Sequence, residues 1–338
     1  MSLPPTSRFQ FTDDLNICRL LNGMWQVSGG HGRIDPQAAL AAMFNYVDAG
    51  FTTWDLADHY GPAEDFVGEF RTRLEKQRGK DALQTIQTFT KWVPRPGKMT
   101  RAVVEENINI SRQRMQTDCL DLLQFHWWDY GDENYLDALH HMADLQQEGK
   151  IKHLALTNFD TDHLKIILDA GIQIVSNQVQ FSVVDRRPLA KMAKVCQENG
   201  VHLFAYGTLC GGFLSENYLG QPAPSRWTMK TVSQRKYFNM IRAWGGWPLF
   251  QELLQGLAAI AKKHECSIAN IAVRYILDQP AVAGAIVGAR LGIQDHIADN
   301  AKVFALQLDA DDDQQLEQLV QSSQDLMTVI GDCGDEYR

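Results

Sequence analysis

Four residues of this chain, Asp55, Tyr60, Lys91 and His126, carry side chains that together can deliver a proton to a carbonyl oxygen. A phenol is a weak acid with an ordinary pKa of about 10. A neighbouring ammonium favours the phenolate, so we expect Lys91 to lower the pKa of Tyr60. A carboxylate such as Asp55 can hold the ammonium, and an imidazole such as His126 can orient a carbonyl by donating a hydrogen bond. The set predicts proton-coupled hydride transfer.

These residues end or follow short apolar runs, which indicates how the fold positions them. Eight such runs occur, near residues 21–25, 52–57, 83–91, 120–127, 152–158, 174–178, 201–206 and 283–288. They are nearly continuous rather than alternating, as is typical of parallel strands covered on both faces. Helical patterns lie between them, as after the Asp35-Pro36 cap. Alternating strands and helices predict an α/β fold, a (β/α)₈ TIM barrel, whose active sites lie at the C-terminal ends of its strands.

An open doubly wound sheet is the alternative that the same alternation allows. It would need a glycine-rich GxGxxG turn after the first strand. The chain has Asn-Gly-Met-Trp-Gln at 22–26 instead, so the barrel is favoured. We expect one domain of 338 residues, with an N-terminal β-hairpin at 8–20, a barrel at 21–305 and a C-terminal helix and tail at 306–338. A stretch rich in Gly, Pro, Trp and Tyr predicts a long loop at 208–247, after strand seven.

Composition excludes several classes of function. A net charge of −9 argues against a general nucleic-acid binder and against adhesion to anionic membranes. Six cysteines lack pairing spacing, which suits reduced thiols in a cytoplasmic enzyme. No CxxC or HExxH motif occurs, so we predict no metal site.

Polar and aromatic residues end the remaining apolar runs. Thr157, Asn158 and Gln178 are suited to bonding a carboxamide, and the Tyr206 ring could stack on a nicotinamide. Gly288 ends the last run ahead of a helical pattern and Arg290 follows it, an arrangement suited to binding phosphate. Tryptophans at strand ends, Trp25, Trp127 and Trp128, could form the walls of an apolar pocket.

The residues in this order resemble those of the aldo-keto reductases, over nearly the whole chain to about residue 308. The resemblance implies a catalytic tetrad of Asp55, Tyr60, Lys91 and His126, and a substrate pocket formed by Trp25, Tyr60, His126 and Trp127. It also implies a set of cofactor-binding residues: Gly23, Met24, Trp25, Asp55, Thr157, Asn158, Gln178, Tyr206, Gly207, Leu209, Gly288, Arg290, His296, Asp299 and Asn300. Four positions depart from the commonest family forms: Met24, Thr157, Phe181 and Asp299 stand for threonine, serine, tyrosine and glutamate.

The cofactor that the resemblance implies is NADPH rather than NADH. Basic residues after the last strand hold its 2′-phosphate in the family. Arg290 is the charged candidate here, and His296 stands where the family often has arginine or glutamine.

The implied activity is reduction of an aldehyde or ketone to an alcohol. Hydride passes from the cofactor to a small-molecule carbonyl substrate, Tyr60 supplies the proton, and His126 orients the carbonyl. The alternative is a cofactor-binding sensor subunit with slow turnover, like the β subunits of voltage-gated potassium channels. No inactivating extension precedes the hairpin, which disfavours that alternative. Tails of this family often fold over the substrate pocket. The alternative expectation is that residues 330–338 are a frayed terminus.

Overall fold

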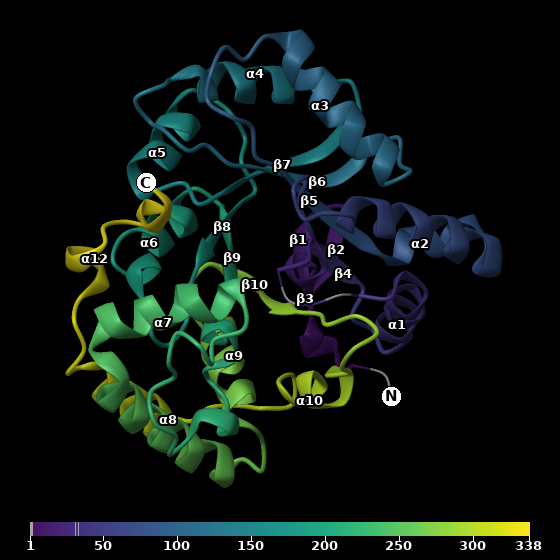
Figure 1. Ribbon diagram of the computed structural model, residues 1–338. Helices are drawn as coiled ribbons and strands as arrows, with labels where there is room; N and C mark the ends of the chain where they lie inside the picture. The colour runs from purple at the N-terminus through teal and green to yellow at the C-terminus, as the bar shows by residue number, and fades with distance from the viewer. Residues whose placement is uncertain (1–2, 31, 33) are drawn as a thin grey trace.

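A computed structural model describes residues 3–30, 32 and 34–338 of the chain. Eight parallel strands form a closed barrel in which β10 returns to pair with β3 (Figure 1). The predicted (β/α)₈ barrel is confirmed. Its strands are β3 (Leu20–Gly23), β4 (Thr53–Asp55), β5 (Gln87–Trp92), β6 (Leu120–Phe125), β7 (Ile151–Thr157), β8 (Ser176–Gln180), β9 (His202–Tyr206) and β10 (Val282–Gly288).

Helices surround the barrel and begin where the sequence supplies capping groups. The Asp35 carboxylate accepts from the Ala38 N–H, and the Thr100 hydroxyl accepts from the Val103 N–H. The helices that link successive strands are α1 (Pro36–Asp48), α2 (Ala63–Arg78), α3 (Arg101–Arg114), α4 (Asn134–Gln147), α5 (Thr161–Asp169), α6 (Met192–Glu198) and α9 (Ile268–Leu277). The additional helices are α7 (Val232–Trp244), α8 (Gly246–Lys263), α10 (Ile297–Lys302), α11 (Ala310–Val320) and α12 (Leu326–Val329).

The predicted hairpin closes the N-terminal end of the barrel. Its strands β1 (Arg8–Thr12) and β2 (Leu15–Cys18) pair antiparallel. Phe11 stacks on Phe204 with ring centroids 5.1 Å apart, and both lie in one apolar cluster with Phe89 and Leu122. Side chains along a strand alternate between faces, so the residues two positions further on also point into the barrel, but nearer its C-terminal end. These are Tyr206, Lys91 and Gln124.

The segment after the seventh barrel strand, β9, is long, as predicted, but it is not a simple loop. Residues 232–244 of it form α7, which begins with a capping box between Thr231 and Gln234. A short 3₁₀ turn, Cys210–Gly212, packs against α7. The predicted loop at 208–247 is therefore corrected to a loop that carries a helix.

The C-terminal part follows the barrel and returns to it. Helix α11 packs against α8, and α12 contacts α7. Figure 1 shows the last residues, in yellow, running past α12 to end beside α5 and α6. Within the described residues no helix combines the length and apolarity needed to cross a bilayer, and all six cysteines are free thiols.

Candidate active site

Asp55 and Lys91 form a buried ion pair at the C-terminal ends of neighbouring strands. The Lys91 Nζ donates to Asp55 Oδ2 at 2.7 Å and to the Leu56 carbonyl at 2.9 Å. Both side chains are only 4% exposed. Burial lowers the pKa of Lys91, and the charge of Asp55 opposes that shift. The predicted pairing of these two residues is present in the structure.

Tyr60 lies in the turn after β4, next to this pair. The Lys91 ammonium lies 5.1 Å from the centroid of the Tyr60 ring, and Trp25 packs edge-on against the same ring at 4.8 Å. The predicted lowering of the phenol's pKa is wrong for this geometry. Burial raises the pKa of Tyr60 well above its usual value, and the negative charge of Asp55 adds to the rise. Tyr60 is therefore a neutral phenol at neutral pH, with its proton in place.

His126 directly follows β6 and is 3% exposed. Its Nδ1 lies 3.0 Å from the Thr157 carbonyl oxygen, and its Nε2 is buried with no hydrogen-bond partner among the described residues. Burial lowers the pKa of His126 to about 4, so the ring is neutral at neutral pH. The donation of a hydrogen bond by His126 to a substrate carbonyl stays a prediction.

Two glutamines complete the hydrogen bonding of Asp55. Its Oδ1 accepts from Gln124 Nε2 at 3.0 Å and from Gln178 Nε2 at 2.7 Å. The same Gln178 Nε2 also donates to Gln124 Oε1 at 2.6 Å. Gln178 was predicted to bind cofactor, whereas Gln124 was missed. A polar residue two positions before His126 in an apolar strand was the signal that could have found it.

The residues expected to bind a carboxamide gather beside this network. Thr157 ends β7, and its hydroxyl donates to the Gln178 carbonyl at 3.2 Å. Asn158 follows with a φ of 59°, and its Oδ1 accepts from the Tyr206 hydroxyl at 2.8 Å. After Tyr206 the chain turns at Gly207, where φ is +73° and an added Cβ would lie 2.4 Å from the Tyr237 hydroxyl. A side chain is excluded there, so the turn requires glycine.

Among the remaining cofactor candidates, Gly23, Met24 and Gly288 lie where β3 and β10 end. Gly23 pairs with Gly288 across these strands, and the Met24 N–H donates to the Asp55 carbonyl at 2.9 Å. An added Cβ on Gly288 would lie 2.0 Å from the amide of Gln26, so this side chain fills the space that the glycine leaves. Further candidates follow in chain order: Leu209 in the turn after β9, the exposed Arg290, His296 before α10, and Asp299 and Asn300 within α10.

Trp127 and Asp299, two of the predicted site residues, make hydrogen bonds within the protein. Trp127 is completely buried, and its indole N–H donates to the carbonyls of Asp129 and Asp132, so it packs beneath the loop. Trp128 lies next to His126 instead, with ring centroids 4.3 Å apart. The Asp299 carboxylate accepts from the Ser267 hydroxyl at 3.1 Å and so joins α10 to the start of α9.

The C-terminal tail lies over this end of the barrel, as the resemblance implied. Glu336 Oε1 accepts from the Tyr206 hydroxyl at 3.0 Å, and Glu336 Oε2 pairs with the buried Arg187 at 2.9 Å. The Tyr337 hydroxyl accepts from Lys236 of α7. Arg338 donates to the carbonyls of Asn158 and Trp127. The tail is therefore part of the site, and Arg187, which sequence reasoning missed, holds it there.

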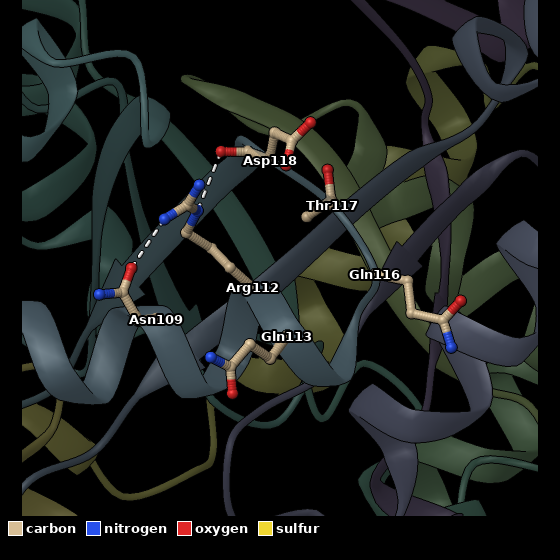
Figure 2. Close-up of a pocket in the computed structure, with 6 residues that line it drawn as sticks. All are labelled: Asn109, Arg112, Gln113, Gln116, Thr117 and Asp118. Atoms are coloured by element: carbon tan, nitrogen blue, oxygen red, sulfur yellow. Dashed lines mark hydrogen bonds between the residues drawn. The ribbon is translucent and has the colours of Figure 1, made fainter.

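A separate pocket lies at the opposite end of the barrel, and it contains none of these residues. It is lined by residues from the end of α3 and the turn that leads into the start of β6 (Figure 2). Arg112 bridges this pocket by donating to Asn109 Oδ1 at 2.7 Å and to the Asp118 carbonyl at 2.9 Å (Figure 2). Asp55, Tyr60, Lys91 and His126 are at the other end of the barrel.

The donor set at the C-terminal end fits a nicotinamide. Both N–H groups of Gln178 are directed to Asp55 and Gln124, which leaves its Oε1 to accept from a carboxamide NH₂. Asn158 and the Tyr206 ring lie beside it, and the unpartnered Nε2 of His126 marks the adjoining space. The residues could therefore hold the reactive end of such a cofactor next to Tyr60.

The chain is similar to known proteins of one family. Residues 19–321 match the model of the aldo/keto reductase family. Flagellar radial spoke protein 5 of Chlamydomonas reinhardtii is 27% identical over 66% of this chain, which spans about half of that protein (49%). The NADH-specific methylglyoxal reductase of Escherichia coli is 23% identical, over 82% of this chain and 87% of the reductase.

The fold also matches solved structures. An aldo/keto reductase from Klebsiella pneumoniae in complex with NADP and acetate superimposes with a TM-score of 0.68 at 21% identity, covering 93% of this chain and 95% of that one. This likeness supports the barrel and its closure. The family model matches most of the chain, and the closed eight-stranded barrel and the buried Asp55–Lys91 pair beside Tyr60 agree with it. This protein therefore belongs to the aldo/keto reductase family.

Proposed function

We propose that this protein is a cytoplasmic NADPH-dependent reductase that converts aldehydes or ketones to alcohols, with Tyr60 as the proton donor. The observation that carries the proposal is the buried Lys91–Asp55 pair, whose ammonium lies 5.1 Å from the centre of the Tyr60 ring. An ammonium that is paired and excluded from water stabilises negative charge on a phenol beside it. The free thiols suit a reducing compartment.

The cofactor, when bound, supplies a hydride to the carbonyl carbon. Tyr60 gives its proton to the carbonyl oxygen, so the product is an alcohol and the phenol is left as a phenolate. Lys91 stabilises that phenolate, and Asp55 holds Lys91 in place through the 2.7 Å hydrogen bond. Because burial holds the phenol in its protonated form, the donor is ready before hydride transfer begins.

The choice of NADPH rests on the segment after β10. Arg290 is exposed and would reach a 2′-phosphate as a guanidinium fork, and His296 precedes α10. An NADH-specific relative exists, so both cofactors must be offered. We expect Arg290→Ser to weaken NADPH binding about tenfold or more and to leave NADH binding unchanged, because only NADPH carries the additional phosphate. Equal effects on the two cofactors would contradict the assignment of Arg290.

The decisive experiment follows cofactor oxidation by absorbance with a panel of aldehydes and ketones. Tyr60→Phe removes the donated proton but keeps the ring, so turnover should fall by about 10²-fold or more. The dissociation constant of NADPH, measured by tryptophan fluorescence quenching, should stay within about twofold of wild type. Unchanged turnover in Tyr60→Phe would remove Tyr60 from its role.

One observation favours a second function, a cofactor sensor with slow turnover. The tail contacts Asn158 and Tyr206, two of the residues expected to bind cofactor, so a seated tail would slow cofactor exchange. Tight NADPH binding together with negligible turnover across the carbonyl panel would favour the sensor. Rapid NADPH oxidation with any member of the panel would favour the reductase.

A further inference from the structure

The tail places a buried carboxylate against the ring on which a nicotinamide is expected to stack. Glu336 Oε1 accepts from the Tyr206 hydroxyl at 3.0 Å, and Glu336 Oε2 accepts from the Gly334 N–H at 3.0 Å. The Glu336 side chain is only 6% exposed. Burial opposes ionisation of this carboxyl, but the charges of Arg187 and Lys236 prevail and lower its pKa. A negative charge therefore adjoins the expected cofactor site at neutral pH.

Glu336 shares its guanidinium partner with a second carboxylate. Arg187 donates to Glu336 Oε2 at 2.9 Å and, through Nε and Nη2, to the two oxygens of Asp185 at 2.8 Å each. This two-pronged contact is the geometry that a guanidinium makes with an ionised carboxylate. The side chains of Arg187 and Asp185 are both 1% exposed. Two carboxylates and one guanidinium leave the Asp185–Arg187–Glu336 cluster with one net negative charge inside the protein.

Lys236 of α7 is a further cation beside this cluster, and aromatic rings hold it. Its Nζ lies 4.9 Å from the centroid of the Tyr206 ring and 4.3 Å from that of the Tyr337 ring. It donates to the Tyr337 hydroxyl, which in turn lies 3.3 Å from the Tyr206 hydroxyl. Tyrosines therefore stand between this ammonium and Glu336. A charge in a protein interior is unfavourable unless an opposite charge meets it, and Lys236 meets this one only at a distance.

A nicotinamide ring is neutral in its reduced form and carries one positive charge in its oxidised form. We propose that Glu336 is the counter-charge for the oxidised ring, and that the Asp185–Arg187–Glu336 cluster raises the affinity for the oxidised cofactor relative to the reduced one. This inference rests on the proposed function, in which the nicotinamide stacks on Tyr206. Positive charge develops on the ring as hydride passes with its electron pair to the carbonyl carbon. Glu336 therefore favours the transfer without gaining or losing a proton itself.

The test measures the dissociation constants of NADP⁺ and NADPH by tryptophan fluorescence with the full-length protein. The two forms share their adenine, ribose and phosphate groups, so the ratio of the two constants isolates the charge on the nicotinamide. Glu336→Gln removes one negative charge and keeps an acceptor oxygen for Tyr206. We expect the constant for NADP⁺ to rise about tenfold more than the constant for NADPH. A ratio equal to that of wild type overturns the proposal.

Lys236→Met should shift the same ratio in the opposite direction. This variant removes a positive charge that lies over the Tyr206 ring, so the oxidised nicotinamide meets less repulsion. NADP⁺ should then gain severalfold in affinity relative to NADPH. A change in how the tail is seated alters the binding of both forms alike, whereas opposite shifts of the ratio in the two variants follow the charge. A shift in the same direction as in Glu336→Gln overturns the proposal.

Glu317→Gln is the matched control. Glu317 pairs with Arg186, the neighbour of Arg187, at 2.6 Å and is 51% exposed, so this variant should keep the wild-type ratio. A shift as large as that in Glu336→Gln overturns the assignment to Glu336.

The ratio needs no carbonyl substrate, so the outcome for Glu336 is separate from that for the proposed function. A protein that binds both cofactor forms but reduces no carbonyl compound is not a reductase, and its ratio still decides the role of Glu336. An active reductase whose Glu336→Gln variant keeps the wild-type ratio overturns this inference alone. Failure of the wild-type protein to bind either form overturns both.

Discussion

The side chain of Gln124 donates to the Asp55 carboxylate at 3.0 Å across the barrel interior, although a whole strand separates β6 from β4. The same glutamine accepts from Gln178 at 2.6 Å. One buried amide therefore links the residue that holds the Lys91 ammonium to the residue expected to bind the nicotinamide. In the proposed function, proton donation and cofactor recognition share this hydrogen-bond network.

Gln124→Leu should impair both functions. Asp55 loses a donor and the Gln178 amide loses its acceptor, so we expect turnover to fall about tenfold and the NADPH dissociation constant to rise severalfold. The measurements are steady-state kinetics and fluorescence titration. Gln87→Leu is the control, because Gln87 is also buried in a strand but accepts from Thr52 and Thr53 at the far end of the barrel. Equal effects in the two variants would mean that Gln124 contributes only to packing.

Lys91→Met should abolish most turnover and also destabilise the fold. Removing one partner leaves the Asp55 charge buried without its ammonium, which costs about 3–5 kcal/mol. The free energy of unfolding is measured with urea. A second change, Asp55→Asn, removes the orphaned charge and should recover much of that stability while leaving turnover low. Recovery of turnover in the double variant would contradict the role of Lys91.

Deleting residues 332–338 should speed cofactor entry. The tail contacts Tyr206 and Asn158, so we expect the association rate of NADPH to rise severalfold in stopped-flow fluorescence and the substrate KM to change. Arg187→Met should act in the same direction, because it removes the partner of Glu336. Arg186→Met is the neighbouring control, since Arg186 pairs with Glu317 on α11 instead. An association rate that neither change alters would leave the tail without a gating role.

Stability at acidic pH should depend on Asp312. Burial opposes ionisation of this carboxyl, but hydrogen bonds from Lys263, the Asp309 N–H and His264 prevail and lower its pKa from 3.8 to about 2. A depressed folded-state pKa stabilises the protein above the unfolded value, and this contribution is lost as the pH falls from about 4 to 2. Asp312→Asn should therefore cost about 1–2 kcal/mol at pH 6 and much less near pH 2.

The control for this change is Asp311→Asn, an exposed neighbour in the same helical turn. Urea unfolding at several pH values gives both stability profiles. Parallel profiles for the two variants would mean that the contacts of Asp312 with Lys263 and His264 do not link the end of α8 to α11.

The barrel and the positions of Asp55, Lys91 and His126 could be predicted because each of these residues ends or follows an apolar run, and parallel topology brings those ends together. Gln124 was within reach of the same reasoning, two positions before His126 on the same strand face. The tryptophans after β6 show the limit. Trp127 and Trp128 were both predicted to line a pocket, and only the folded structure shows that Trp127 is fully buried whereas Trp128 lies beside His126.

Other features depend on contacts that no local pattern records. Arg187 meets Glu336 across 149 positions of sequence, and a guanidinium followed by proline has no local signature of such a partner. The pKa of Tyr60 was predicted from Lys91 alone. Its direction is set by burial and by the opposing charge of Asp55, which only the folded structure defines. Helix α7, in contrast, could have been predicted, because Thr231 and Gln234 form a capping box at its start.

The seating of the tail has a practical consequence for how the protein is produced. Gly334 passes so close to Asn158 that an added Cβ would lie 2.1 Å from its carbonyl oxygen, and Arg338 reaches the Trp127 carbonyl at 2.7 Å. Vector-encoded residues appended after Arg338 would have to leave this crowded surface and could pull the last residues with them. An affinity tag is better placed before the hairpin, which closes the opposite end of the barrel, so that residues up to Arg338 keep these contacts.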